Sequence, residues 1–130
     1  MRKYSCYIPV ILILMSFCSL ILFRGSLTRY ASRIMTNGME PEEKSIVENI
    51  ISEQYDYSKN TKGYECTFLE FGSVGCNSCR QMESVMAEIK QKYSNRVKVV
   101  FINVSQKENR ELVDYFGIVT IPTQVLLDKK

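Results

Sequence analysis

Apolar residues are distributed along this chain in two ways. The first is continuous: the twenty residues 4–23 carry no charge. The second is periodic and begins near Pro41, where apolar residues recur every three or four positions and predict a helix with one buried stripe. That stripe consists of Ile46, Val47, Ile50, Ile51 and Tyr55. The polar residues 56–63 end this helix.

Beyond residue 63, strand-like runs alternate with helical ones. Residues 67–71, 97–104 and 123–127 are rich in β-branched and aromatic side chains and predict three strands. A helical repeat separates the first two runs and consists of Met82, Val85, Met86, Ile89 and Tyr93. The alternation of helices and strands predicts an α/β sandwich, with the run 97–104 at the centre of a parallel sheet.

A short helix is expected between the last two strands. Ser105 and Glu108 have the spacing of a capping box, and Gly117 has the position of a helix stop.

The leading apolar stretch has the length of a membrane span. As a helix, residues 4–23 would extend about 30 Å, which matches the hydrocarbon core of a bilayer. No small-residue cleavage site follows, which favours an uncleaved anchor over the alternative, a removed export signal. We expect an anchor or signal over residues 1–24, a polar linker over 25–40 and a folded domain over 41–130. Basic residues flank both ends of the stretch, so charge does not assign its orientation.

Charge and composition exclude several classes of function. Five of the 17 basic residues and none of the 14 acidic ones lie in residues 1–33, so the folded domain is slightly acidic. This balance argues against nucleic-acid binding, which requires a basic face. The chain has no histidine, which excludes Cys-His and Ser-His catalytic pairs and histidine-ligated metal sites.

Two cysteines carry the candidate chemistry. Cys76 and Cys79 follow the first strand-like run, after a turn marked by Gly72 and Gly75, and open the next helix. Thiols at this spacing can form a reversible disulfide. Unpaired amides at a helix start favour a thiolate and lower the pKa of a thiol placed there. Cys76 is therefore the candidate nucleophile, and Cys79, one turn further along, is the candidate resolving thiol.

Residues 41–128 resemble a thioredoxin-family domain. Two separated motifs stand at the family's spacing, which makes the resemblance more specific than either motif alone. The matching segments are 68–82 with both cysteines, Asn103-Val104, and 115–123 with Ile121-Pro122-Thr123.

The resemblance implies roles for further residues. The Ile121-Pro122 peptide bond would be cis and lie against the cysteine pair, with Ile121, Pro122 and Gly75 forming the surface that binds an extended substrate segment. Glu70 would be the family's buried acid, which assists proton transfer at Cys79 and whose pKa burial should raise. The alternative for Glu70 is a solvent-facing strand residue.

The implied fold is α/β, a thioredoxin-like three-layer sandwich without the family's final edge strand and helix, preceded by the transmembrane or signal helix. Several positions depart from the family pattern. Gly75 replaces a tryptophan, Phe101 aligns with a buried lysine, and Asn77-Ser78 matches neither the dipeptide of thioredoxin nor that of protein disulfide isomerase. Because these two intervening residues tune the redox potential, the direction of electron flow stays open.

The sequence thus predicts a membrane-tethered thiol-disulfide oxidoreductase. It would exchange disulfides with protein substrates and with an unidentified electron donor or acceptor, without an organic cofactor or metal. Its domain is expected on the extracytoplasmic, periplasmic side, where disulfide exchange is needed. The alternative is a truncated, noncatalytic interaction module in which the Cys76-Cys79 disulfide is structural.

Cys66 is expected to be a small buried core residue. Two weaker alternatives are a third redox thiol and a metal site formed with Cys76 and Cys79, which would lack a fourth ligand.

Overall fold

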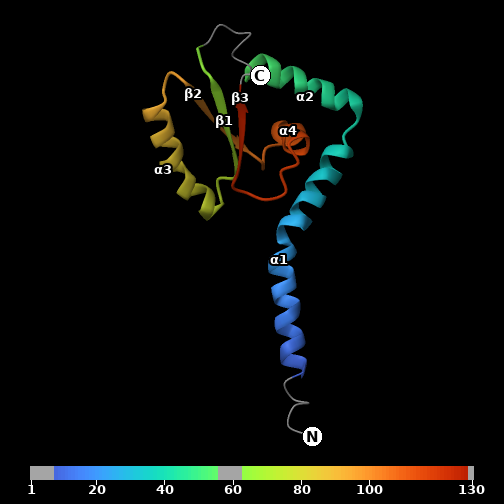
Figure 1. Cartoon of the computed structure of the whole chain (residues 1–130). Coiled ribbons are helices and arrows are strands. Elements are labelled where there is room, and N and C mark those ends of the chain that lie inside the picture. Colours follow the sequence, from blue (N-terminus) through green and yellow to red (C-terminus); the bar gives the residue numbers. More distant parts are fainter. Residues whose placement is uncertain (1–7, 56–62, 129–130) are drawn as a thin grey trace, which may run out of the picture.

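The computed structural model describes residues 8–55 and 63–128 (Figure 1). Its elements, in chain order, are α1 (Ile8–Asn37), α2 (Pro41–Gln54), β1 (Cys66–Gly72), α3 (Asn77–Lys92), β2 (Val97–Asn103), the 3₁₀ turn η1 (Lys107–Asn109), α4 (Arg110–Tyr115) and β3 (Thr123–Asp128). The three strands form one sheet in the order β2-β1-β3. Strand β1 runs parallel to β2 and antiparallel to β3.

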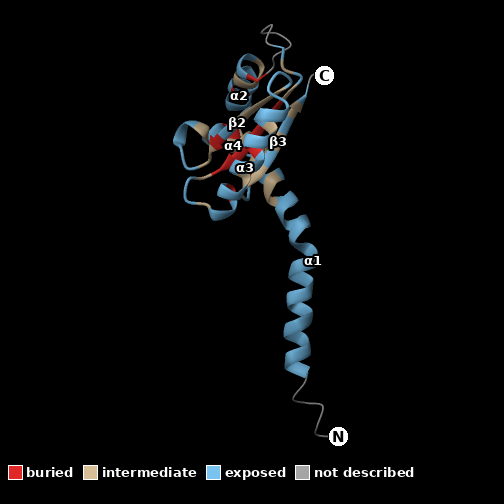
Figure 2. Cartoon of the chain, turned by 90° about the vertical axis from the view of Figure 1, so that its left-hand side faces the viewer, coloured by how far each residue is buried: buried red, intermediate tan, exposed pale blue. Residues whose placement is uncertain are grey.

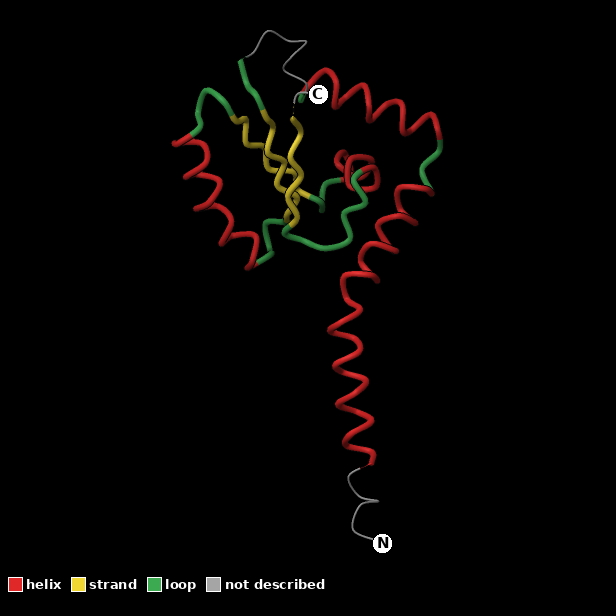
Figure 3. Tube along the Cα trace, in the orientation of Figure 1, coloured by secondary structure: helices red, strands yellow, loops and turns green. Residues whose placement is uncertain are grey.

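Helices cover both faces of this sheet. Helix α3 lies on one face, and α2 and α4 lie on the other (Figures 1 and 3). The buried residues lie mainly on the sheet, with others on α2, α3 and α4, as the red segments of Figure 2 show. The core cluster consists of Val47, Tyr55, Leu69, Phe71, Ile102, Leu112 and Ile118. This is the three-layer α/β arrangement that the sequence predicted, and no further strand or helix follows β3 among the described residues.

The central strand is β1, so the prediction that the run 97–104 is central was wrong. Among the described residues, β2 pairs with β1 alone, whereas β1 pairs on both sides. Leu69 and Phe71 of β1 are fully buried, while Phe101 of β2 is 43% exposed. Strand β2 is apolar because Ile102 enters the core and its other face contacts α3. A strand covered on both faces has this composition whether or not it lies at an edge.

The predicted capping box does not form. Asn103 instead makes the turn after β2: its side-chain oxygen accepts from the backbone N–H of Ser105 at 3.1 Å, and its carbonyl accepts from the Asn109 side chain at 2.9 Å. These local side chain–backbone hydrogen bonds replace the expected pairing of Ser105 with Glu108. Gly117 follows the end of α4 as predicted, with a φ of +58°.

Helix α1 extends through most of the segment that was predicted to be a polar linker, residues 25–40. The hydroxyls of Thr28 and Thr36 donate to backbone carbonyls one turn earlier, at 2.9 and 3.0 Å. Polar side chains that satisfy themselves on their own helix do not interrupt it. The segment is therefore helical through Asn37 rather than irregular. The three predicted domain boundaries stay a prediction.

Among the described residues, α1 alone is long and apolar enough to cross a membrane. The apolar part of α1 is not buried against the rest of the described structure. Large side chains such as Leu12, Phe17 and Leu22 are each more than half exposed. These features make α1 a candidate membrane anchor or export signal.

The last turns of α1 pack on the domain. Gly117 contacts Ser32 so closely that a Cβ on the glycine would collide with the Ser32 side chain and lie 2.9 Å from its carbonyl oxygen. Ser32 is correspondingly half-buried, although it lies on a helix that is otherwise largely exposed. The contact sets the position of α1 against the loop that leads from α4 to β3.

Gly117→Ala should lower the free energy of unfolding by about 1–3 kcal/mol, because alanine is disfavoured at positive φ and its Cβ would push α1 away. Urea denaturation of the full chain in neutral detergent measures this change. Gly63→Ala is the matched control, since nothing lies within 4 Å of the position of its added Cβ. Equal stabilities of the two variants would contradict the close contact between Gly117 and α1.

Candidate active site

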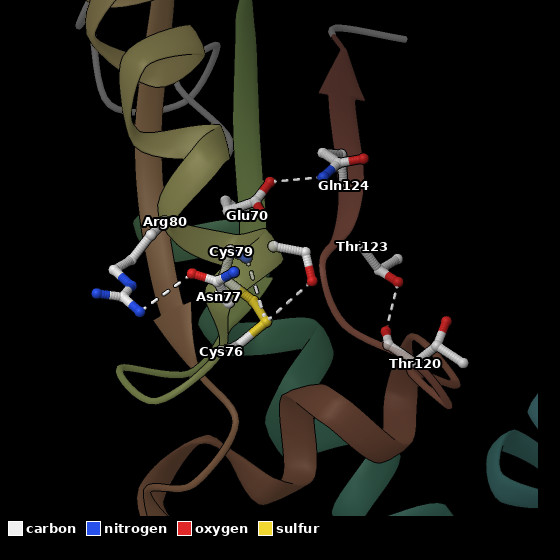
Figure 4. Close-up of a disulfide and its surroundings, with 9 residues drawn as sticks. Glu70, Cys76, Asn77, Cys79, Arg80, Thr120, Thr123 and Gln124 are labelled. Atoms are coloured by element: carbon white, nitrogen blue, oxygen red, sulfur yellow. Dashed lines mark hydrogen bonds between the residues drawn. A yellow bond between two sulfur atoms is a disulfide. The ribbon is translucent and has the colours of Figure 1, made fainter.

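A disulfide joins Cys76 and Cys79 at the N-terminus of α3 (Figure 4). Cys76 is the N-cap residue, with extended backbone (φ −84°, ψ 115°), and its sulfur accepts a hydrogen bond from the backbone N–H of Cys79 at 3.2 Å. The sulfur therefore occupies the place where a side-chain acceptor normally satisfies a free helix amide. Negative charge on this sulfur would be stabilised by that amide and by the helix dipole.

Cys76 and Cys79 differ in their exposure to solvent. Cys79 is 3% exposed, whereas Cys76 is half-buried. The residue before Cys76, Gly75, is exposed, and an added Cβ there would meet nothing within 4 Å. An incoming sulfur can thus approach Cys76 from an open surface but cannot reach Cys79 in the same way.

Gly72 allows the start of α3 to lie close to the sheet. A Cβ at this last position of β1 would lie 3.2 Å from the sulfur of Cys79 and 2.8 Å from the ring of Phe101. The absence of a side chain therefore lets the buried cysteine rest directly on the end of the central strand. The sequence indicated a turn at Gly72 but not this packing role.

The two residues between the cysteines bring polar groups to the site. The hydroxyl oxygen of Ser78 lies 3.7 Å from the Cys76 sulfur, and in the disulfide only the hydroxyl can donate. The Asn77 side-chain oxygen accepts from the Arg80 guanidinium at 3.1 Å. The Ser78 hydroxyl is thus the polar side-chain group beside the Cys76 sulfur, while Arg80 pairs with Asn77.

Glu70 is fully buried on β1, so the solvent-facing alternative was wrong. It pairs across the sheet with Gln124 of β3, whose side-chain N–H donates to Glu70 Oε2 at 2.8 Å. The other carboxylate oxygen, Oε1, has no hydrogen-bond partner among the described residues. Burial raises the pKa of Glu70, and the hydrogen bond from Gln124 acts in the opposite direction. Figure 4 shows this pair above the disulfide, at the start of α3.

Gln124 is the site residue that the sequence reasoning missed. The one indication of it in the sequence is a glutamine beside the apolar run Val125-Leu126-Leu127. Its partner follows from the antiparallel register of β3 on β1, which no sequence pattern specifies.

The Ile121-Pro122 peptide bond is cis, as the resemblance implied. Thr123 closes the loop by donating from its hydroxyl to the carbonyl of Thr120 at 2.6 Å. Figures 1 and 4 both show this loop at the same end of the sheet as the N-terminus of α3. The structure therefore brings the cysteines, Glu70 and the loop together.

Cys66 lies at the other end of β1, six strand positions from Gly72 and so about 20 Å away from it. Its thiol is free and half-buried, and its pKa is raised by burial and by the charge of Asp128. This separation excludes both a third redox thiol and a shared metal site with Cys76 and Cys79. Among the described residues, no group of three or more potential ligands could hold a metal ion.

Comparison with known proteins identifies the family. The model of the thioredoxin family matches residues 47–130. The chain belongs to the thioredoxin family. This membership confirms the resemblance that the sequence carries over residues 41–128.

Individual relatives cover part of the chain. Thioredoxin from Alicyclobacillus acidocaldarius is 31% identical over 71 residues, which cover 55% of this chain and 66% of that protein. Thioredoxin 1 from Synechococcus elongatus is 38% identical over 45% of this chain and 52% of its own length. The chloroplastic thioredoxin-like protein HCF164 of rice is 33% identical over 49% of this chain and 24% of its own length. The matched region thus spans about two thirds of these relatives or less.

The solved structure of oxidised thioredoxin O2 from Arabidopsis thaliana superimposes with a TM-score of 0.50. The superposition covers 65% of this chain and 68% of that chain, at 16% sequence identity. At this identity, the likeness shows the fold alone.

Glu70→Gln should change how stability depends on pH. Because the pKa of Glu70 is raised, the folded protein keeps a proton that the unfolded chain releases above about pH 4.3. Below that pH, the preference of the folded protein for the protonated Glu70 carboxyl contributes fully to the free energy of unfolding. This contribution is lost as the pH rises through the pKa that Glu70 has in the folded protein. The free energy of unfolding of Glu70→Gln, relative to wild type, should therefore increase as the pH rises from about 4 to 8.

Urea denaturation of the oxidised chain across this pH range measures the difference. The exposed Glu83 of α3 provides the matched control variant, Glu83→Gln. Parallel pH courses for wild type and Glu70→Gln would be incompatible with a raised pKa at Glu70.

Proposed function

We propose that this protein is a membrane-tethered thiol-disulfide oxidoreductase that exchanges disulfides with protein substrates. The observation that carries this proposal is the Cys76-Cys79 disulfide at the start of α3, with one sulfur accessible and the other buried. A purely structural disulfide, as in an interaction module, needs no such difference in access.

The exchange proceeds in two steps. The thiolate of Cys76 attacks a substrate disulfide, so that a Cys76–substrate disulfide forms while the substrate's own S–S bond breaks and its leaving sulfur takes a proton. Cys79 then attacks the Cys76 sulfur, which restores the Cys76-Cys79 disulfide and releases the second substrate sulfur as a thiol. Two electrons pass from the protein to the substrate, and the reverse sequence oxidises a substrate dithiol.

Glu70 is the proposed proton acceptor for Cys79 during the second step. Its carboxyl is buried beneath the start of α3, and Oε1 has no other hydrogen-bond partner among the described residues. A carboxyl with a raised pKa binds a proton more readily near neutral pH than an exposed glutamate does. Gln124 holds the other oxygen and so orients the carboxyl.

The substrate segment is proposed to lie across Gly75, Ile121 and Pro122. Gly75 has no side chain to obstruct the approach to Cys76, and the loop with the cis bond lies at the same end of the sheet. An extended segment can hydrogen-bond to exposed backbone of such a loop, as in strand addition to a sheet edge.

Helix α1 is proposed to hold the domain at a membrane, on the extracytoplasmic, periplasmic side. Its exposed apolar residues need a nonpolar environment, and disulfide exchange is sustained in oxidising compartments. A membrane-bound or soluble thiol protein would act as the unidentified electron donor or acceptor.

Cys76→Ser should reduce the rate of insulin disulfide reduction by dithiothreitol to the rate without protein, because no thiolate remains to begin the exchange. Turbidity of the precipitating insulin chains measures the rate. Cys66→Ser is the matched control and should keep the wild-type rate, since Cys66 lies at the far end of β1. Equal rates for wild type and Cys76→Ser would remove the proposed activity.

Cys79→Ser should accumulate a mixed disulfide between Cys76 and substrate, because the resolving step is lost. Non-reducing electrophoresis of the full chain after incubation with a disulfide-bonded substrate detects the adduct, which dithiothreitol should release. The double variant Cys76→Ser/Cys79→Ser should form none. If Cys79→Ser forms no more adduct than the double variant, Cys79 is not the resolving thiol.

A further inference from the structure

A cleft of about 380 Å³ lies between α1 and the chain segment that connects α4 to β3. One wall is the polar face of α1, including Arg29 and Arg33. The opposite wall includes the apolar side chains of Phe116 and Val125. The cleft exists because α1 continues as a helix beyond its apolar part and contacts the domain at Gly117.

Among residues 8–55 and 63–128, no acidic side chain lines the cleft to balance its positive charge. Its lining contains Arg29 and Arg33 and no acidic residue. Neither arginine forms an ion pair or hydrogen bond with any residue that the structure describes. The two lie one helical turn apart and so share a face of α1. Two adjacent guanidinium groups above an apolar wall are complementary to a peptide that carries an acidic side chain next to an apolar one.

The cleft adjoins the proposed redox site. Thr120 and Thr123 line it, and these residues flank the cis Ile121-Pro122 bond. The same loop lies at the end of the sheet where Cys76 begins α3 (Figure 4). A substrate segment that crosses this loop on its way to Cys76 would therefore continue into the cleft.

The position of the arginines along α1 favours a protein ligand over a lipid headgroup. Arg29 and Arg33 lie six and ten residues beyond Phe23, the last residue of the apolar stretch, which places them about 9 and 15 Å further along the helix. The headgroup layer of one leaflet is only about 5–8 Å thick. If α1 spans a bilayer, both arginines stand above the headgroups, at the level of the cis-proline loop.

We propose that this cleft is a substrate subsite, in which Arg29 and Arg33 select protein substrates that carry an acidic side chain a few residues from the reactive cysteine. The proposal rests on the oxidoreductase function proposed above. It makes α1 part of the substrate-binding surface as well as a tether.

Three matched peptides test the subsite. Each carries one cysteine as a mixed disulfide with thionitrobenzoate, and they differ only in having Glu, Gln or Lys at the positions three to five residues from that cysteine. The full chain is reduced beforehand and kept in neutral detergent. Its Cys76 thiolate attacks the peptide sulfur and releases thionitrobenzoate, whose absorbance gives the second-order rate constant. Cys79 then releases the peptide thiol and forms the Cys76-Cys79 disulfide.

The Glu peptide should react about three- to tenfold faster than the Gln peptide at low salt, and the Lys peptide more slowly than either. Added salt should reduce the preference. Arg29→Gln/Arg33→Gln should bring the ratio of Glu to Gln rates close to one by slowing the reaction of the Glu peptide. Arg24→Gln is the matched control and should keep the wild-type ratio, since Arg24 does not line the cleft.

Two results would overturn the proposed subsite without affecting the proposed redox function. One is a wild-type ratio of Glu to Gln rates close to one, and the other is a ratio that the double arginine variant does not change. A third would do so as well. If nanodiscs with anionic lipid abolish the preference while neutral nanodiscs preserve it, the arginines bind headgroups instead. If none of the three peptides reacts, the proposed redox function fails and the subsite with it.

Discussion

The hydrogen bond from the Cys79 amide to the Cys76 sulfur is the interaction on which the proposed chemistry of this domain depends. It exists because Cys76 occupies the N-cap of α3, where helix amides have no partner within the helix. The start of α3 is in turn fixed by β1, since Gly72 allows Cys79 to rest on the end of that strand. Strand β1 is itself held by β2 and β3, which pair with it on both sides from Cys66 to Phe71.

Burial then gives the two cysteines different exposure and places the Glu70 carboxyl beneath the start of α3. Glu70 is a costly residue for a central strand, because a buried carboxyl with one unpaired oxygen is poorly compensated for its lost hydration. The Gln124 hydrogen bond offsets only part of that cost. A buried acid whose pKa is raised, next to a disulfide, is the kind of arrangement that marks functional sites rather than stable cores.

The sequence predicted those features that depend on local patterns. The strand–turn–helix around Cys76 and Cys79, the end of α4 at Gly117 and the helix starting at Pro41 each follow from residues within a few positions of one another. Features that depend on strand partners were not predictable in this way. Strands β1 and β2 have similar apolar compositions, so composition could not identify β1 as central.

The same limit applies to Gln124 and to α1. The hydrogen bond from Gln124 to Glu70 requires a register between strands 54 residues apart in sequence. The polar residues after Phe23 indicated a polar linker, yet a helix that already spans many turns extends at little cost through threonine and serine. That extension places α1 beside the cis-proline loop, where it changes the surface that a substrate would meet.

The reduction potential of the Cys76-Cys79 pair tests the central claim most directly. Equilibration of the full chain with glutathione buffers, followed by alkylation of free thiols, measures it. A helix N-terminus that stabilises the Cys76 thiolate favours the reduced form, so the account predicts a value within the range of disulfide-exchange proteins, about −270 to −120 mV. A potential below about −300 mV, typical of structural disulfides, would contradict it.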